Sequence, residues 1–213
     1  NDDNDAPVNL PKYVKVFRTS INRANQKSNE YALPAWSSDF KDNSCFRNKS
    51  TKPVIGFCGA LTHACRGASI QSLEKNNNVT TNFIIRKLFW GGDPHNNQLR
   101  NEYIDNLKKS DLILCCRGAG NFSYRLYEAL SMNKIPILID TNNVLPCSDI
   151  IDWSKFILAS PENVNEKVDS FWENLDNNKY MELQKYCRDI YETYLNPPGF
   201  AAYINHHYDN KLF

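Results

Sequence analysis

The chain has 213 residues, 41% of them hydrophobic, so it can bury a substantial core in one large domain, with or without an appendage. Its 25 basic and 24 acidic residues leave a net charge of +1. The sequence has no block of like charge of the kind that indicates a nucleic-acid surface or a membrane anchor. No apolar run reaches the roughly 18 residues that predict a membrane span. The first residues, NDDNDAP, are typical of a trimmed or disordered end and not of a signal peptide.

The seven cysteines are scattered, odd in number and never spaced as C-x-x-C. Cys115 and Cys116 are adjacent, which is poor geometry for pairing with each other. This pattern favours buried, reduced thiols and therefore a cytoplasmic protein. The sequons at Asn48, Asn78 and Asn121 leave an alternative open, which is the secretory lumen if an N-terminal anchor was removed.

Taken in chain order, the predicted elements begin with a short appendage, or the remnant of an acceptor domain, over residues 1–51. Residues 13–17 (YVKVF) are one candidate strand within it. Apolar runs then predict strands over residues 53–58, 82–87, 111–116, 135–140 and 155–160. Amphipathic segments predict helices over residues 66–76, 97–110, 122–132, 164–175 and 178–195. Continuously apolar strands that alternate with helices predict an α/β domain over residues 52–195, a parallel sheet with helices on both faces. Residues 196–213 are expected to form a helical tail.

The segment RGAGN, residues 117–121, lies between a predicted strand and a predicted helix. Ligands of open α/β sheets bind at the carboxyl ends of the strands, often against a helix N-terminus. Gly118 and Gly120 would allow a sharp turn and a close approach to a ligand. Asn121 is a candidate N-cap for a helix that starts near Phe122. The free amides at such a helix end favour an anion, most naturally a phosphate.

Asn121, Arg125 and Glu128 form a stripe along one edge of this helix, three to four residues apart. A carboxylate at Glu128 can accept hydrogen bonds from both ribose hydroxyls, and a guanidinium at Arg125 can meet a diphosphate. The pattern therefore predicts a nucleotide site. The alternative is that Arg125 and Glu128 form only a surface ion pair at i,i+3 spacing.

Residues 115–153, CCRGAGNFSYRLYEALSMNKIPILIDTNNVLPCSDIIDW, resemble the exostosin family of glycosyltransferases (family 47, GT-B fold). That family has an R-G-x-x-x-F-x-[RY]-x-x-E-A-L core, followed by a stretch like GxIPVI and then LPF-x-D-x-IDW. The matching residues are Arg117, Gly118, Ser123, Arg125, Glu128, Ala129, Leu130, Ile135, Pro136, Leu145, Pro146, Asp149, Ile151, Asp152 and Trp153. FIIRKLFWGG, residues 83–92, is similar to the family's microbial and viral branch. The sequence departs from the pattern at Asn133 and Cys147.

The resemblance implies an enzyme that transfers a sugar from a UDP-sugar donor to a glycan or glycoprotein acceptor, with inversion. It implies a Rossmann-like fold, equivalent to the C-terminal, donor-binding domain of GT-B enzymes. Glu128 would hold the ribose, and Arg125 and Arg117 would neutralise the diphosphate. No metal and no cofactor would be required, because arginines and helix dipoles stabilise the departing diphosphate.

Two more arginines are candidates for the donor site. Arg86 lies at the end of the second predicted strand, where the alternatives are contact with a ligand and a solvated strand end. Arg66 lies in the segment that follows the first predicted strand. The general base is unidentified, with His63 and Asp39 as candidates; a histidine such as His63 is more often a loop or core residue.

Two other classes of protein are alternatives to this enzyme. The first is a non-catalytic module that binds a nucleotide sugar or a glycan, as one half of a two-domain or two-chain enzyme. It stays open because residues 1–51 are too short for a second Rossmann-like half. The second is a dinucleotide-dependent oxidoreductase, which is disfavoured because no G-x-G-x-x-G follows the first strand and residues 84–87 (IIRK) end the second on basic residues.

Overall fold

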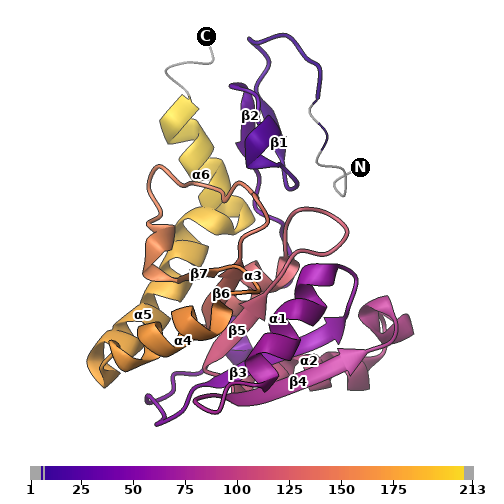
Figure 1. Ribbon diagram of the computed structural model, residues 1–213. Coiled ribbons are helices and arrows are strands. Elements are labelled where there is room, and N and C mark those ends of the chain that lie inside the picture. The colour runs from indigo at the N-terminus through magenta and orange to yellow at the C-terminus, as the bar shows by residue number, and fades with distance from the viewer. Residues whose placement is uncertain (1–5, 7, 209–213) are drawn as a thin grey trace.

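A five-stranded parallel sheet forms the centre of the structure, a computed structural model that describes residue 6 and residues 8–208 (Figure 1). Its strands are β3 (Val54–Ala60), β4 (Thr80–Arg86), β5 (Leu112–Cys115), β6 (Ile135–Ile139) and β7 (Ile157–Ala159). They lie in the order β4-β3-β5-β6-β7, and every neighbouring pair is parallel. The predicted α/β class is therefore confirmed. Most of the predicted trimmed end and residues 209–213 of the predicted tail lie outside the described residues.

The central strands are apolar throughout because helices cover both faces of the sheet. Every residue of β5 and β6 is buried, so no alternation of polar and apolar residues is needed. The helices around the sheet are α1 (Ala64–Glu74), α2 (Asn97–Lys109), α3 (Tyr124–Ser131), α4 (Val164–Glu173) and α5 (Asn177–Ile190). Helices α1 and α4 pack together on one face, whereas α3 lies on the other face and packs against α5 (Figure 1).

The chain reverses its direction across the sheet at β3. It moves outward from β3 to β4 through α1, and then returns through α2 to β5, on the other side of β3. Right-handed crossovers in opposite directions place their helices on opposite faces of the sheet. The loops that follow β3 and β5 therefore diverge, and they leave a crevice at the carboxyl ends of these strands.

The N-terminal appendage contains a small parallel sheet of two strands, β1 (Val16–Arg18) and β2 (Glu30–Ala32). The sequence predicts only one strand here, and β2 is missed because its first residue is a charged glutamate in a polar stretch. Glu30 is 2% exposed and accepts hydrogen bonds from Arg18 Nη1 at 2.8 Å and from the Val8 and Lys27 amides. A buried ion pair thus occupies a position in β2 where a buried strand normally has an apolar residue, so the hydrophobic pattern of the sequence does not indicate this strand.

The predicted tail returns to this appendage. Helix α5 continues through a π-helical turn, η5 (Tyr191–Leu195), into α6 (Pro197–Tyr208). Pro197 begins α6, as proline does readily at a first helical position. The Phe200 ring contacts those of Phe17 and Trp36, so α6 lies beside β1 and β2 (Figure 1). Short 3-10 helices occur at η1 (Arg23–Asn25), η2 (Lys41–Asn43), η3 (Phe89–Gly92) and η4 (Trp153–Lys155).

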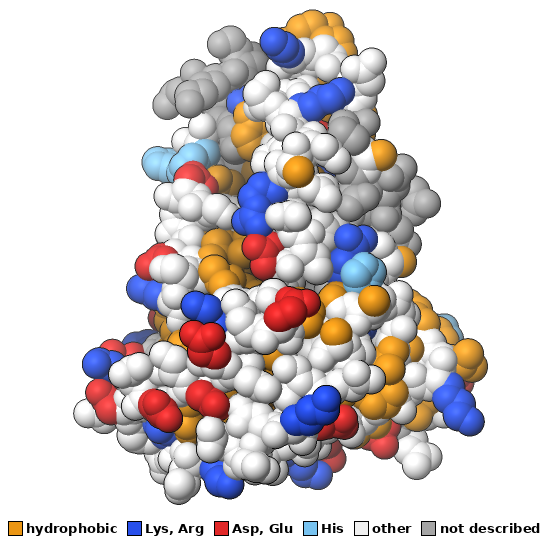
Figure 2. Space-filling view, in the orientation of Figure 1, with side chains coloured by type: hydrophobic (Ala, Val, Ile, Leu, Met, Phe, Trp, Pro, Cys, Tyr) orange, Lys and Arg blue, Asp and Glu red, His pale blue; other side chains and the backbone are white. Residues whose placement is uncertain are grey.

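Positive and negative side chains are interspersed over the face of the molecule that Figure 2 shows, in keeping with the net charge of +1. Within residues 6 and 8–208, no helix combines the length and the apolar character needed to cross a membrane.

Candidate functional site

A cavity of about 350 Å³ lies at the carboxyl ends of β3 and β4, beside the loop that follows β5. This volume is typical of small-molecule sites, and the position is the one where the strand order reverses. Two carboxylates, Asp93 and Glu128, line the cavity. They are outnumbered by the lining arginines, which are Arg66, Arg86, Arg100 and Arg125. The cavity is therefore suited to an anion.

Arg125 is placed by the first turn of α3 and is 8% exposed. Its guanidinium lies over the Phe57 ring at 4.3 Å, and Nη2 donates to the Cys58 carbonyl at 2.7 Å. Nε has no hydrogen-bond partner among the described residues. Gly59 makes room for this side chain, since a Cβ there would lie 2.8 Å from Nη2. Burial opposes the charge of Arg125, but nearby negative groups, including Glu128, outweigh it and raise the pKa of Arg125.

Arg66 comes from α1 and joins the ends of β3 and β5. Its Nε donates to the Arg117 carbonyl at 2.7 Å, and Nη1 to the Ala60 carbonyl at 2.7 Å. Arg66 is 7% exposed, and burial, followed by the positive charge of Arg125, lowers its pKa to about 10. Two guanidiniums that repel each other in a buried place are a favourable setting for a doubly charged anion between them.

Glu128 is the buried carboxylate beside these arginines and is 4% exposed. The Tyr103 hydroxyl donates a hydrogen bond to Oε2, and Arg100 Nη1 lies 3.9 Å from Oε1. Burial raises the pKa of Glu128, although the Tyr103 hydrogen bond and the charge of Arg125 act in the opposite direction. The alternative of a surface ion pair between Arg125 and Glu128 is therefore wrong, because both side chains are buried in the cavity wall.

Helix α3 begins at Tyr124, with Ser123 as its N-cap, and the Ser123 side chain makes no capping hydrogen bond. Ser123 and Tyr124 line the cavity, so the N-terminal end of α3, which favours an anion, lies at the cavity wall. The prediction that Asn121 caps this helix is wrong. The Asn121 side-chain Nδ2 instead donates to the Thr141 carbonyl at 3.3 Å, and Oδ1 accepts from Thr141 Oγ1 at 2.6 Å. Asn121 is 1% exposed and ties the loop to the end of β6.

The loop bends sharply over residues 119–122, where the sequence predicts a turn at Gly118 and Gly120. In the described part of the chain, glycines with positive φ are Gly59, Gly91 and Gly92, so Gly118 and Gly120 do not provide a left-handed turn. Both line the cavity. Gly118 allows a close approach of a side chain, because a Cβ there would lie 3.3 Å from Arg66 Nη2.

The structure brings together seven of the nine residues predicted to bind the donor. The seven that line the main cavity are Arg66, Arg86, Gly118, Gly120, Ser123, Arg125 and Glu128. Arg117 and Asn121 line a separate cavity of about 70 Å³, and Arg117 Nη2 donates to the Ala119 carbonyl of its own loop at 2.8 Å. Arg86 is tied to α2, since its Nη2 donates to the Leu99 carbonyl at 2.7 Å and to Glu102.

The two candidate bases, His63 and Asp39, do not line the main cavity. His63 is the N-cap of α1, where its Nδ1 accepts from the Cys65 amide at 3.2 Å. Asp39 Oδ2 accepts from Arg188 Nη2 at 3.0 Å, in an ion pair with α5. The geometry therefore does not support either residue as the general base of a reaction in this cavity. Within the described residues no group of three or more His, Cys, Asp or Glu side chains is placed to hold a metal ion. A metal-free reaction stays a prediction.

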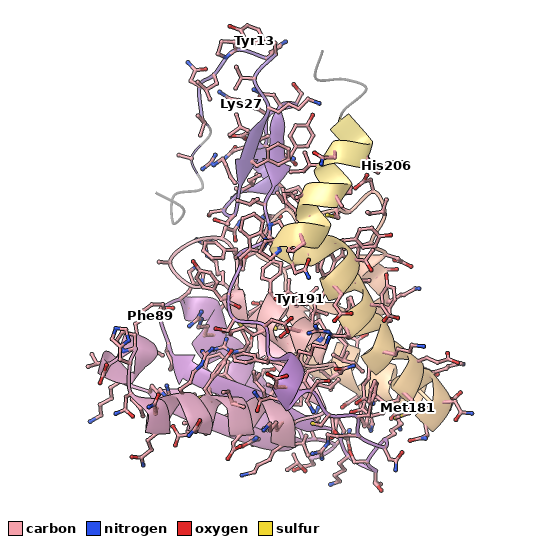
Figure 3. All side chains as sticks on the ribbon, turned by 180° about the vertical axis from the view of Figure 1, so that it is seen from behind. Tyr13, Lys27, Phe89, Met181, Tyr191 and His206 are labelled. Carbon is pink, nitrogen blue, oxygen red and sulfur yellow. The ribbon has the colours of Figure 1, made fainter. Side chains whose placement is uncertain are left out.

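Sequence reasoning missed Arg100 and Tyr103, which α2 supplies to the cavity. Their i,i+3 spacing places both on one face of the helix, but Tyr103 is indistinguishable in the sequence from an ordinary core residue. Phe89, in the loop before α2, also lines the cavity and is 60% exposed, at the outer edge of the molecule in Figure 3.

A parallel sheet with an arginine-rich cavity where the strand order reverses defines a Rossmann-like α/β domain with a candidate ligand site at its switch point. The chain belongs to the RXYLT1 C-terminal domain family, which matches residues 34–164. The predicted resemblance to exostosin-like glycosyltransferases is thereby confirmed.

Two curated human relatives illustrate the relationship. Ribitol-5-phosphate xylosyltransferase 1 is 32% identical over 97 residues, which cover 45% of this chain and 22% of that protein. Exostosin-2 is 25% identical over 129 residues, covering 60% of this chain and 17% of that protein. The chain thus spans about a fifth of the length of these relatives.

The fold is shared with TarM, whose crystal structure superposes with a TM-score of 0.51 at 13% identity. The match covers 84% of this chain and 39% of TarM. A crystal structure of a TarM mutant from S. aureus, with the same TM-score of 0.51, contains fondaparinux, alpha-GlcNAc-glycerol and UDP. The likeness confirms the predicted Rossmann-like fold.

Proposed function

We propose that the chain is the donor-binding part of a glycosyltransferase that moves a sugar from a UDP-sugar to a glycan acceptor, with inversion and without a metal. One observation carries the proposal. Two buried guanidiniums, of Arg66 and Arg125, and one buried carboxylate, of Glu128, line the same cavity at the switch point of the sheet. Family membership supports the same activity.

The diphosphate of the donor would lie between Arg66 and Arg125, against the first turn of α3. Arg125 Nε lacks a partner among the described residues, and a phosphate oxygen would supply one. Negative charge grows on the diphosphate as its bond to the anomeric carbon breaks. Fixed positive groups in a water-poor site stabilise this charge, so the arginines would do what a metal ion does elsewhere.

The ribose would lie beside Glu128. A carboxylate accepts hydrogen bonds from two adjacent hydroxyls, and Tyr103 holds one of its oxygens in place. The acceptor hydroxyl would attack the anomeric carbon from the face opposite the diphosphate and lose its proton to a base. The acceptor is proposed to be a glycan or glycoprotein, and the compartment to be the reducing cytoplasm, since the structure holds all seven cysteines as free thiols.

The second candidate function is a module that binds the nucleotide sugar without turnover. The observation that favours it is that neither candidate base, His63 or Asp39, lines the cavity. Such a module would need a partner domain or chain to supply the base.

Calorimetric titration with UDP and with uridine, in EDTA, tests the proposal. We expect UDP to bind in EDTA and more tightly than uridine, because the arginines contribute only to the diphosphate. Failure of UDP to bind, or binding that needs added manganese, contradicts the metal-free site. A panel of UDP-sugars then separates the two functions. Release of UDP with or without an acceptor glycan indicates an enzyme, whereas binding without release indicates a module.

A further inference from the structure

Phe57 lies in β3, beneath the cavity, and contacts both of the buried arginines. The Arg125 guanidinium carbon lies 4.3 Å from the centre of the Phe57 ring, and the Arg66 guanidinium carbon lies 5.9 Å from it. Phe57 is fully buried and does not itself line the cavity. Any effect of this ring on a ligand therefore passes through the arginines.

The two arginines place two positive charges in one buried region. Burial, and after it the positive charge of Arg125, lowers the pKa of Arg66, so the two guanidiniums repel each other before an anion binds between them. The face of an aromatic ring is negative, and it attracts a cation within about 6 Å, more strongly where water is excluded. Phe57 therefore supplies an attraction that opposes this repulsion.

Hydrogen bonds hold the two arginines unequally. Among the described residues, one hydrogen bond holds Arg125, from Nη2 to the Cys58 carbonyl at 2.7 Å. Arg66 donates to backbone carbonyls from Nε, Nη1 and Nη2. A single hydrogen bond leaves a planar group able to rotate about it. The orientation of the Arg125 guanidinium therefore depends on the Phe57 ring, whereas that of Arg66 depends on it less.

The sequence of β3 makes room for this arrangement. Side chains alternate along a strand, so Phe57 and Gly59 lie on the same face of β3. A Cβ at Gly59 would lie 2.8 Å from Arg125 Nη2 and 3.9 Å from Phe57 Cζ. The Arg125 guanidinium thus occupies the space of the side chain that Gly59 lacks, and an aromatic residue followed two positions later by glycine allows it to pack on the ring.

We propose that Phe57 is a positioning residue of the anion site, whose ring holds the guanidinium of Arg125, and to a lesser degree that of Arg66, in the orientation that binds a diphosphate. The identity of the ligand rests on the proposed function. Such a ring contributes to the affinity for a diphosphate but not for uridine, because uridine carries no charge for the arginines to bind. A ring that only packs the core would affect both ligands alike, or neither.

Calorimetric titration of Phe57→Leu with UDP, inorganic pyrophosphate and uridine tests this role. Leucine keeps an apolar side chain at the position but has no aromatic face. We expect UDP and pyrophosphate to bind about tenfold more weakly, and uridine to bind as it does to the wild type. Unchanged affinity for UDP and pyrophosphate, or an equal loss for uridine and UDP, overturns the proposal.

The matched control is Phe83→Leu, the same substitution in the neighbouring strand. Phe83 pairs with Phe57 in the register of β3 and β4, with 6.5 Å between the ring centroids, and it does not line the cavity. This variant should lose stability through lost packing and keep all three affinities. A loss of UDP affinity equal to that of Phe57→Leu would mean that aromatic packing in general, and not the contact with the arginines, matters.

A double-mutant cycle tests whether the ring acts through Arg125. In an Arg125→Ala background, Phe57→Leu should weaken UDP by less than about threefold, because the main group that the ring holds is absent. The same tenfold loss in both backgrounds would show that Phe57 acts by another route, and the proposal would be wrong.

A substitution that preserves the shape of the ring decides the question if Phe57→Leu does not fold. 3,5-Difluorophenylalanine, placed at residue 57 by amber suppression, withdraws electrons from the face of the ring. It leaves Cζ, the atom of Phe57 nearest to a Gly59 Cβ, unsubstituted. We expect the affinities for UDP and pyrophosphate to fall by about threefold, and the same amino acid at residue 83 to leave both unchanged. Wild-type affinities with the fluorinated ring at residue 57 overturn the proposal.

Pyrophosphate separates this proposal from the proposed function. If the wild type binds pyrophosphate but not UDP, and binding depends on Phe57, the nucleotide function fails and the positioning role stands. If UDP binds equally well to the wild type and to the Phe57 variants, the positioning role fails and the function stands. If the wild type binds neither ligand, both fail.

Discussion

Arg125 and Glu128 lie one helical turn apart but contact different groups. Substitutions at the two positions are therefore expected to change the affinities for UDP and uridine in different ways. Glu128→Gln should weaken UDP and uridine alike, by roughly ten- to a hundredfold, because a charge-assisted hydrogen bond to the ribose contributes about 1.5–3 kcal/mol. Arg125→Ala should weaken UDP strongly and leave uridine almost unchanged. Calorimetric titration of each variant with both ligands measures this difference.

The control for this pair is Glu166→Gln, an exposed residue in the first turn of α4, which should bind both ligands like the wild type. A slower turnover of Arg125→Ala is also expected, since charge on the leaving group grows in the transition state. Equal affinities of wild type, Arg125→Ala and Glu128→Gln for UDP would contradict the placement of the nucleotide.

Gly59 tests whether the position of Arg125 matters as well as its charge. A Cβ at Gly59 would lie 2.8 Å from Arg125 Nη2, so Gly59→Ala should displace the guanidinium and weaken UDP by roughly tenfold or more. Gly67 in α1 is the matched control, because a Cβ there meets nothing within 4 Å. Gly67→Ala should keep the affinity and raise the free energy of unfolding by about 0.5–1 kcal/mol. The same loss of UDP binding in both variants would refute the steric explanation.

At the scale of elements, the hydrogen bond from Tyr103 to Glu128 joins α2 to α3 across the cavity. Burial raises the pKa of Glu128 above its value in the unfolded chain, so the ionised carboxylate destabilises the folded state. This penalty is fully present above the folded pKa. It is relieved as the pH falls through the folded pKa toward the unfolded value of about 4.3.

The prediction concerns the difference in the free energy of unfolding between wild type and Glu128→Gln. The contributions of the other titratable groups largely cancel in this difference, because both proteins contain them. Between pH 7 and pH 4.5 the wild type should gain stability relative to Glu128→Gln, which does not titrate at this position. Urea unfolding of both proteins at several pH values measures the difference. Tyr103→Phe removes the hydrogen bond that opposes the raised pKa, and should move the change to higher pH. A difference that is constant with pH rules out a titrating Glu128.

The elements around the cavity differ in how far the sequence predicts them. Strands β3 to β7 and their helices are predictable because apolar runs and helical periodicity coincide with burial on both faces of the sheet. The position of Arg66, Arg125 and Glu128 at one edge follows from the βαβ order. The contribution of Arg100 and Tyr103 from α2 cannot be predicted in this way. A periodic pattern shows which face of a helix is apolar, but not which part of the structure that face contacts. The helix start at Tyr124 and the tether from Asn121 to Thr141 also depend on contacts distant in sequence.

At the scale of the whole molecule, the sequence predicts one α/β domain over residues 52–195, with an appendage over residues 1–51 and a tail over residues 196–213. In the structure the described parts of the appendage and of the tail pack against each other. The family match from residue 34 to residue 164 also crosses the predicted boundary at residue 51. Trp36 Nε1 donates to the Leu195 carbonyl at 3.0 Å, which ties the appendage to the end of η5. The chain ends therefore contribute to one packed unit, and Phe200 is the residue at which this can be tested.

The Phe200 ring is 2% exposed and meets Phe17 at 6.1 Å and Trp36 at 6.0 Å between ring centroids. Removing a buried phenyl ring costs about 3–5 kcal/mol, so Phe200→Ala should lower the stability of the whole chain by that amount. If the appendage and α6 unfold together with the sheet, circular dichroism and tryptophan fluorescence should report one coincident transition at a lower urea concentration.

Tyr13→Ala is the control, since Tyr13 is 86% exposed at the tip of the appendage (Figure 3) and should change stability by no more than about 0.5 kcal/mol. UDP affinity should survive in Phe200→Ala below its transition, because Phe200 does not line the cavity. Two separate transitions, or an unchanged midpoint for the sheet, would mean that the ends of the chain are attached to the α/β domain without stabilising it.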